Sequence, residues 1–382
     1  MSKLLDAAKA GQAKFFLQFG GQGAPYLKEM QKLYAEASMK PFFDVAVSAI
    51  EAAAKMVEGT AAHPEKVDFR KWLTEPDHAP SDDAMSIAGV SLGLIAATQF
   101  AHYEYLHQQG FNRAEMLKHT VAASGHSQGL ITASFTALSL EGKAHYDAIY
   151  KYIQYLFLMG VRAQEVFPAI HATADETAKS EALGAKGPAP MVAVLGDSHA
   201  TIEGWVNAYN GSGPKKIYVS LYNTPNNRIV SGARTDLIAF HEKHKADFEA
   251  KQIKFVYLRS TCPFHCELMV PILEKFKPDL AKIGFDFKGS DLKFPVYSFW
   301  DGANLQNEGE LGMRMTDDLM VKTLYWEKSM LPVKNDKSIT AILDFGPGKT
   351  SQRLSMDTLT GLGHEVPVYA IAFAKDLKTV LE

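Results

Sequence analysis

The chain has 382 residues, of which 47% are hydrophobic and 22% charged, and its formal net charge at pH 7 is −3. These values are ordinary for a folded globular protein of one large or two medium-sized domains, and they argue against nucleic acid or an anionic membrane as a partner. No apolar run approaches the ~20 residues that a bilayer-spanning helix needs, and residues 1–16 lack a signal-peptide core. We therefore expect a cytoplasmic protein that does not associate with membranes.

The first part of the chain combines one strand with several helices. Residues 14–19 (KFFLQF) form a short apolar run, typical of a buried strand, which ends in the glycine-rich segment 20–23 (GGQG). Helical patterns follow at 25–36 and 41–57. The small and apolar residues of 85–106 predict a largely buried helix.

A second strand leads directly into a helix. Residues 119–124 predict a short strand, 128–138 a helix that opens from it, and 143–166 a long aromatic helix. The pentapeptide 125–129 (GHSQG) joins the strand to the first of these helices. Its serine, Ser127, is therefore predicted to lie at a tight strand-to-helix turn.

A smaller unit follows the Gly/Pro-rich joint 184–190. Its predicted elements have the order β-α-β-β-α-β, which is typical of a ferredoxin-like unit. They cover 191–196, 198–210, 216–223, 227–232, 234–249 and 253–258. The α/β pattern resumes afterwards at 294–300 and 339–348.

The order of the elements predicts an α/β protein in two parts. Residues 1–187 and 259–382 would form a large subdomain with a mostly parallel sheet, and 188–258 an inserted ferredoxin-like subdomain. We expect a ligand site in the cleft between them.

Ser127 is a candidate nucleophile because G-x-S-x-G between a strand and a helix is the pattern of a nucleophile elbow. The glycines would let two chain segments approach closely, and the helix would direct its free N–H groups at the serine oxygen. The backbone N–H of Gln128 would then be an oxyanion donor. The pentapeptide alone would fit a Gly-flanked loop serine equally well, but the flanking elements favour the nucleophile.

A nucleophilic serine needs a base, and His265 is the candidate. It follows a strand and a proline at the entry to an amphipathic helix, where a capping or surface histidine is the common alternative. His126 is a rival, but adjacent side chains on a tight turn diverge, so we expect it to make a structural hydrogen bond. Cys262 and Cys266 flank His265, yet a zinc site needs three or four ligands with recognisable spacing. We expect two reduced thiols and no metal.

The loop 19–25 (FGGQGAP) follows the first strand, where loops at the carboxyl ends of strands gather around a site. Its glycines free the backbone, so Gln22 is a candidate for the second oxyanion donor. A plain turn is the alternative. A phosphate-binding loop is excluded because no G-K-[ST] follows.

These elements in this order resemble the acyl-CoA:acyl-carrier-protein transacylase family, which has the malonyl/acetyl transferase fold. The family carries G-Q-G, then G-H-S-x-G, an inserted ferredoxin-like subdomain and P-x-H, which correspond here to Gln22, Ser127, 191–258 and His265. The resemblance covers nearly the whole chain and implies a large subdomain like that of the α/β-hydrolases. Further matching segments are 190–196, 222–232, 294–302 and 344–348.

A narrower likeness joins 86–106 and 125–133 to the starter-unit acyltransferase domain of fungal-type fatty acid synthases and iterative polyketide synthases. Malonyl-specific relatives carry an arginine on the long helix after the serine, which holds the malonyl carboxylate. Met159 occupies that place, and a thioether lines an apolar pocket but binds no carboxylate. If the register slips by three residues, Arg162 becomes the clamp.

By this resemblance the reaction is ping-pong acyl transfer through an acyl-serine, with acyl-CoA as substrate and no permanently bound cofactor. The implied base, His265, is oriented mainly by backbone carbonyls, and Asp344 is better suited to positioning backbone than to a triad. Asn223 would line the cleft. The implied partner is an acidic acyl carrier protein. Candidate docking charges are Lys215, Lys216, Arg228, Lys349 and Arg353, although each alone would fit a solvated surface charge.

Other functions fit parts of the pattern. Malonyl transfer is the alternative by substrate. A thioester hydrolase would use the same serine and histidine, although an α/β-hydrolase has the chain order Ser…Asp…His and an H-G-G-G-type loop instead. A non-catalytic carrier-protein-binding module is the third alternative, and it does not explain why Ser127, His265 and Gln22 are all present.

Overall fold

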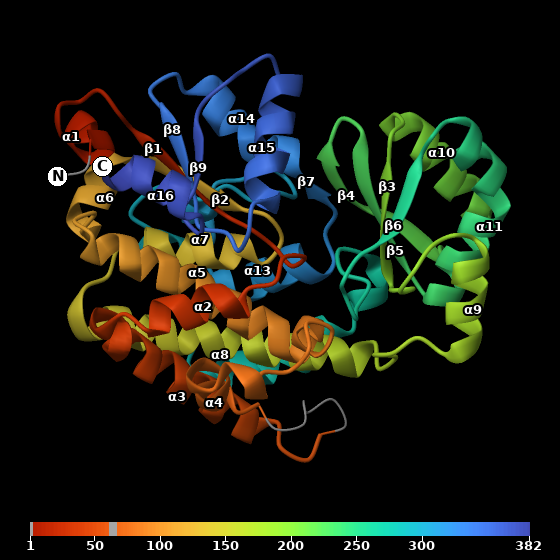
Figure 1. Ribbon diagram of the computed structural model, residues 1–382, viewed down its shortest axis with the longest axis horizontal. Coiled ribbons are helices and arrows are strands. Elements are labelled where there is room, and N and C mark those ends of the chain that lie inside the picture. Colours follow the sequence, from red (N-terminus) through yellow and green to blue (C-terminus); the bar gives the residue numbers. More distant parts are fainter. Residues whose placement is uncertain (1–2, 61–66) are drawn as a thin grey trace.

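The computed structural model describes residues 3–60 and 67–382, which form a larger and a smaller body (Figure 1). Within these residues the larger body holds a four-stranded sheet of order β2-β1-β8-β9, in which each neighbouring pair is parallel. The mostly parallel sheet predicted from the sequence is therefore confirmed. Its strands are β1 (Phe15–Phe19), β2 (Thr120–Gly125), β8 (Ala341–Asp344) and β9 (Val368–Ala370).

The central strands are covered on both faces. All residues of β1 and β8 are buried, as expected for a parallel sheet between two layers of helices. Figure 1 places α14 (Trp326–Asn335) and α15 (Thr350–Gly361) on one side of this sheet, and α5 (Ala88–Gln108), α7 (Gly129–Ala137) and α8 (Gly142–Val166) on the other. The helices α5 and α8 pack along each other. Their close approach requires a glycine at Gly160, where a Cβ atom would lie 2.1 Å from the carbonyl oxygen of Ala88.

The remaining helices of the larger body surround this core. Helices α1 and α16 pack against each other, so the two ends of the described chain lie side by side (Figure 1). The bounds are α1 (Lys3–Lys9), α2 (Leu27–Tyr34), α3 (Lys40–Met56), α4 (Phe69–Thr74), α6 (Arg113–His119), α7 (Gly129–Ala137), α12 (Ile272–Ile283), α13 (Leu311–Met320), α14 (Trp326–Asn335), α15 (Thr350–Gly361) and α16 (Ala374–Leu381).

The smaller body follows the predicted element order. Its strands and helices run β3-α10-β4-β5-α11-β6, and the sheet order within the described residues is β6-β3-β5-β4-β7. The pairs among β3 to β6 are antiparallel, whereas β7 joins β4 in parallel. The bounds are β3 (Met191–Leu195), α10 (His199–Asn210), β4 (Ile217–Thr224), β5 (Asn227–Gly232), α11 (Arg234–Ala250), β6 (Lys254–Tyr257) and β7 (Leu324–Tyr325).

Two segments outside 188–258 also belong to the packing of the smaller body. The strand β7 extends its sheet, and α9 (Ala174–Ala182) packs against α11. The sequence analysis predicted neither segment, and β7 has only two residues, too few to show an alternating pattern. The domain bounds derived from the sequence therefore remain a prediction.

The two faces of the smaller sheet have different neighbours. Val192 and Val194 of β3 pack with side chains of α10 and α11 in a separate hydrophobic cluster. The alternate residues of the same strand, Met191, Ala193 and Leu195, face the other way, because successive side chains of a strand point to opposite faces. This second face borders the pocket described below.

The segment 294–300 is not a regular strand. Val296 forms only an isolated parallel bridge to Ala123 of β2. Ala123 donates its N–H to the carbonyl of Pro295 (2.9 Å) and accepts from Tyr297 (3.0 Å). Pro295 has no N–H to extend this pairing.

None of the described helices combines the length and the apolar composition that crossing a bilayer requires.

Candidate active site

Ser127 lies at the turn between β2 and α7, with a φ of 55°. A Cβ atom at Gly129 would lie 2.2 Å from the carbonyl oxygen of Phe19, and one at Gly125 would lie 1.8 Å from the carbonyl carbon of Gly129. Both positions therefore exclude any side chain. The predicted reason for the two glycines is confirmed: they let β1, β2 and α7 meet at the serine.

His265 reaches this serine from a distant part of the chain. Its Nε2 atom lies 2.8 Å from Ser127 Oγ. Its Nδ1 atom lies 2.9 Å from the carbonyl oxygen of Lys322, which can only accept a hydrogen bond. The ring proton therefore sits on Nδ1, and the Nε2 lone pair faces the hydroxyl group of Ser127.

Burial keeps the imidazole of His265 uncharged. The side chain is enclosed, and the loss of hydration lowers its pKa to about 3, although the carbonyls of Lys322 and Asp318 favour the protonated form. The ring can thus take a proton from Ser127 at neutral pH. The carbonyl of Lys322 would stabilise the imidazolium that forms.

His126 does not compete for the serine. Its Nε2 atom lies 2.8 Å from Asn223 Oδ1, and the pKa of this buried ring is lowered to about 4 by desolvation. The predicted structural hydrogen bond of His126 is therefore present. Asn223 borders the pocket, as we expected.

Asp344 lies on the sheet away from the histidine. Its carboxylate accepts hydrogen bonds from the Gly346 N–H (2.9 Å) and from Ser351 Oγ (2.8 and 3.0 Å), and burial raises its pKa to about 6. Asp344 thus positions the loop after β8 and is not a partner of His265, in agreement with the sequence interpretation.

Two backbone segments flank the serine oxygen. The N–H of Gln128 has no hydrogen-bond acceptor within the described chain, and it precedes the first residue of α7. On the other side, a Cβ atom at Gly21 would lie 3.3 Å from Ser127 Cβ, so the 20–23 loop touches the serine. The next residue, Gln22, lines the pocket, while its side-chain amide donates to Ser91 Oγ (2.5 Å). Its backbone N–H likewise has no acceptor among the described residues.

A pocket of about 240 Å³ opens above the dyad of Ser127 and His265. One wall is the face of the smaller sheet that points away from α10 and α11, and it is mainly apolar. Its apolar residues are Met191, Ala193, Leu195, Leu221 and Ile229, and Asn223 and Asn227 of the same sheet also line the pocket. Of the described lysines and arginines, only Arg259 lines this pocket, and its guanidinium lies 3.2 Å from the Asp82 carboxylate.

Residues 17–265 match the model of one protein family, described as the starter unit:ACP transacylase in aflatoxin biosynthesis. The match contains Gln22, Ser127 and His265 and covers more than half of the chain. The chain belongs to this transacylase family.

Curated relatives of this transacylase-family chain are subunits of large synthases. The fatty acid synthase subunit beta of Saccharomyces cerevisiae is 28% identical over 375 residues, covering 92% of this chain and 18% of the relative. The subunit beta of Schizosaccharomyces pombe is 29% identical over 376 residues, covering 92% of this chain and 17% of the relative. The chain thus spans less than a fifth of the length of these relatives.

Solved structures share the fold of this chain. An acyl carrier protein S-malonyltransferase from Vibrio cholerae superposes with a TM-score of 0.67 at 17% identity, covering 96% of this chain and 100% of that one. A malonyl-transacylase in complex with a type II PKS acyl-carrier protein superposes with a TM-score of 0.65 at 17% identity, covering 97% and 99%. At this level of identity the likeness establishes the fold alone.

The two predicted selectivity residues of the transacylase lie on α8, outside the pocket lining. Met159 is fully buried in the hydrophobic core, beside the tight contact of Gly160 with α5. Arg162 donates to both carboxylate oxygens of Asp279 (2.6 and 3.1 Å) and to Glu165 (2.7 Å). Packing therefore encloses Met159 and acidic partners hold Arg162, so the structure does not bring either side chain to the pocket beside Ser127.

The cysteines beside His265 are free and buried. Cys266 Sγ lies 3.0 Å from the carbonyl oxygen of Pro263, and burial raises the pKa of both thiols to about 12. Among the described residues, no group of three or more His, Cys, Asp or Glu side chains is arranged to hold a metal ion.

One of the predicted docking charges is internal. Arg228 is fully buried, and its guanidinium donates to His199 and to the carbonyls of Asp197 and Pro225. It cannot meet a partner, so this prediction is wrong. The other four candidates are exposed: Lys215, Lys216, Lys349 and Arg353.

Sequence reasoning missed three contributors to the site. Arg259 lines the pocket directly after β6, and Lys322 orients His265 through a backbone carbonyl, which no side-chain motif reports. Ser91 holds Gln22. Only Arg259 had a sequence signal, because it lies between the predicted strand 253–258 and the histidine segment.

Proposed function

We propose that this chain transfers an acyl group from coenzyme A to the phosphopantetheine thiol of an acyl carrier protein. The observation that carries the proposal is the 2.8 Å contact between Ser127 Oγ and a neutral His265 at the floor of a pocket. A serine paired with an uncharged, oriented imidazole is an activated nucleophile. Membership of the transacylase family supports the choice of an acyl carrier protein as acceptor.

The first half-reaction forms an acyl-serine. Ser127 Oγ attacks the thioester carbon while His265 Nε2 takes the hydroxyl proton. In this mechanism the N–H groups of Gln128 and Gln22, for which no acceptor is found in the described chain, bind the oxyanion. The carbon–sulfur bond then breaks, and the departing thiolate takes the proton from the imidazolium and leaves as coenzyme A.

The second half-reaction reverses these steps with a different thiol. The phosphopantetheine thiol gives its proton to His265, and its sulfur attacks the acyl-serine ester. Collapse of the oxyanion breaks the bond to Ser127 Oγ, which regains the proton. The apolar wall of the pocket would slow the competing hydrolysis by limiting access of water.

An uncharged starter acyl group is the substrate that we favour. The pocket wall is mainly apolar, and Arg162, the residue that could clamp a malonyl carboxylate, is held by Asp279. Malonyl transfer is the second candidate because Arg259 brings one cation to the pocket. A cytoplasmic location and the absence of a resident cofactor remain predictions from the sequence.

The decisive experiment measures the mass of the intact protein after brief incubation with acetyl-, octanoyl-, palmitoyl- or malonyl-CoA. We expect an acetyl or longer adduct on Ser127 that disappears in Ser127→Ala. A dominant malonyl adduct that is lost in Arg259→Ala would support malonyl transfer. Release of free acid without an adduct would support a hydrolase. If neither an acyl adduct nor free acid formed, the result would support a non-catalytic binding module.

A further inference from the structure

The position of His265 depends on the C-terminal end of α13. The His265 N–H donates to the carbonyl of Met320 (2.9 Å), and the ring Nδ1–H donates to the carbonyl of Lys322 (2.9 Å). Both acceptors lie at or just after the last turn of this helix, Leu311–Met320. Any shift of this turn would therefore move the base relative to Ser127.

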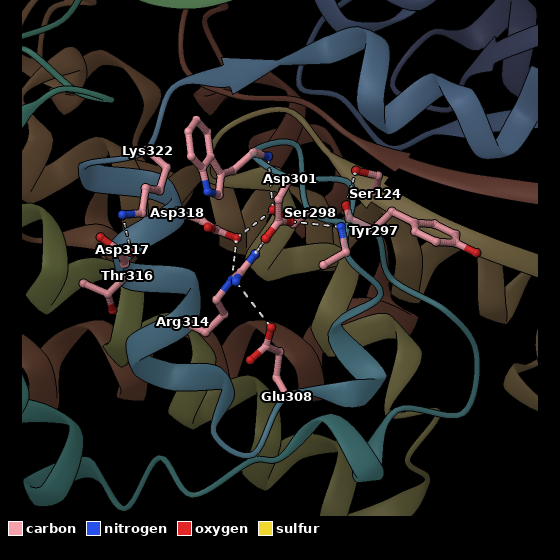
Figure 2. Close-up of polar contacts among 12 residues, drawn as sticks. Ser124, Tyr297, Ser298, Asp301, Glu308, Arg314, Thr316, Asp317, Asp318 and Lys322 are labelled. Atoms are coloured by element: carbon pink, nitrogen blue, oxygen red, sulfur yellow. Dashed lines mark hydrogen bonds and ion pairs between the residues drawn. The ribbon is translucent and has the colours of Figure 1, made fainter.

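An unusual acid lies in that last turn. Asp318 is fully buried, although a carboxylate near a helix C-terminus is disfavoured by the helix dipole and burial adds a further cost. Its Oδ2 atom accepts from Ser298 Oγ (2.8 Å) and from Arg314 Nε (3.2 Å), as Figure 2 shows. Its Oδ1 atom has no hydrogen-bond partner within the described chain. Burial raises the Asp318 pKa to about 6.

The partners of Asp318 connect the helix to the strand that carries the nucleophile. Ser298 belongs to the segment that bridges to β2, and Ser124 of β2 donates to the neighbouring carbonyl of Tyr297 (2.8 Å; Figure 2). On the other side, Arg314 is held by Asp301 (2.6 Å) and Glu308 (3.3 Å). The side chain of Asp318 is thus fixed between Ser298, whose segment bridges to β2, and a charged cluster.

We propose that Asp318 is a positioning residue for His265, which fixes the end of α13 to the segment beside β2 and so holds the base against Ser127. The inference rests on the proposed function only in taking Ser127 as the nucleophile and His265 as its base. Asp318 acts on the ring through its carboxylate, which anchors the turn that leads to the Lys322 carbonyl. Because misplacement of a reacting group by ~1 Å costs about 10²-fold in rate, loss of this anchor would slow the serine reaction.

The test uses a fluorophosphonate probe on the full chain. Ser127 Oγ attacks phosphorus, fluoride leaves, and the hydroxyl proton passes to His265, so labelling reports the dyad without coenzyme A. Failure of acyl-CoA to acylate the protein would therefore count against the proposed function and leave this test intact. Wild-type protein that is not labelled, or is labelled equally in His265→Ala, would overturn the inference.

The variants separate positioning from stability. We expect Asp318→Ala to lower the second-order labelling rate constant by at least about 10-fold. Ser298→Ala keeps the ion pair between Asp318 and Arg314, and we expect it to lower this rate constant by about 3-fold. Asp318→Asn should recover part of the rate because its amide oxygen still accepts from Ser298. Glu104→Gln is the matched control, since this buried acid pairs with Arg113 in a cluster outside the pocket lining.

The control should lower the unfolding temperature and leave the labelling rate constant of the folded protein unchanged. A rate constant for Asp318→Ala within about two-fold of wild type would overturn the proposal. If Asp318→Ala does not fold, the labelling rate constant of Ser298→Ala provides the test. A value within about two-fold of wild type for Ser298→Ala would overturn the proposal.

Discussion

Ser127 and His265 lie 138 residues apart, and both have a positive φ, 55° and 61°, where their side chains meet at 2.8 Å. This backbone region is uncommon for residues other than glycine, and it costs of order 1–3 kcal/mol at each position. Both strained residues are therefore held by their surroundings. The glycine contacts of β1 and α7 constrain the serine, and the end of α13 constrains the histidine.

Removal of Ser127 should abolish acylation, whereas removal of His265 should only slow it. Ser127→Ala should give no acyl adduct, and His265→Ala should slow adduct formation by about 10²–10⁴-fold, because general-base catalysis contributes this much. Rapid-quench mass spectrometry with acetyl-CoA measures both. His126→Gln is the control and should change the rate by less than about 10-fold. An equal loss in the two histidine variants would contradict the assignment of the base.

The glycines of the elbow should be irreplaceable for steric reasons. We expect Gly129→Ala to destabilise the protein by at least ~3 kcal/mol, because its Cβ would overlap the carbonyl of Phe19. Gly204→Ala in α10 is the matched control, since a Cβ there meets nothing within 4 Å. It should raise the free energy of unfolding by ~0.5–1 kcal/mol. Urea unfolding measures the free energy of unfolding of both variants. Similar values for the two would disprove the steric argument.

Acylation should persist to unusually low pH. The His265 pKa is lowered to about 3, so the neutral, proton-accepting form remains populated as pH falls. In Asp318→Asn, which has no carboxyl group to titrate at this position, we expect the rate constant at pH 5 to lie within about two-fold of that at pH 7.5, whereas an ordinary histidine base would lose about 30-fold. Asp318 has a pKa of about 6 and titrates in this window, so Asp318→Asn is measured in parallel. A midpoint near 6.5 in both proteins would refute the prediction.

Arg162 should matter for stability and not for substrate choice. Arg162→Ala leaves Asp279 without its main partner, and the side chain of Asp279 is 2% exposed. Breaking a buried pair in this way costs about 3–5 kcal/mol, discounted here because Arg162 itself is 14% exposed. The ratio of acetyl to malonyl acylation in the folded variant should stay within about two-fold of wild type. A selective loss of malonyl labelling would restore Arg162 as the carboxylate clamp.

Charges beside the pocket mouth should affect only the carrier-protein half-reaction. Lys349 and Arg353 are exposed next to Thr350 and Leu354, which line the pocket. Lys349→Glu with Arg353→Glu should raise the KM for an acidic carrier protein by about 10-fold at low salt and less at high salt. Acylation by acyl-CoA in the absence of carrier protein should not change. Lys118→Glu, on the exposed side of α6, is the control, and an equal effect there would show that docking is not local.

Much of the site could be predicted from local sequence patterns. The apolar run before GGQG, the strand before GHSQG and the helix after it are short-range features, and the structure places Gln22 and Ser127 together as these features predicted. The β-α-β-β-α-β order was also readable, because each element has its own periodicity. The burial of Met159 and the pairing of Arg162 with Asp279 could not be read from the sequence, because helical periodicity does not say which helix face meets a pocket and which meets a neighbouring helix or acid.

Sequence by itself determined which residues can do the chemistry: a serine between glycines, a histidine after a proline, and strands that end in flexible loops. Tertiary structure decided what surrounds them. It enclosed Arg228, paired Arg162 with Asp279, and brought the carbonyl of Lys322 to His265. The physical reason is that local backbone preferences act over a few residues, whereas burial, ion pairing and carbonyl acceptors arise from segments that are distant in the chain.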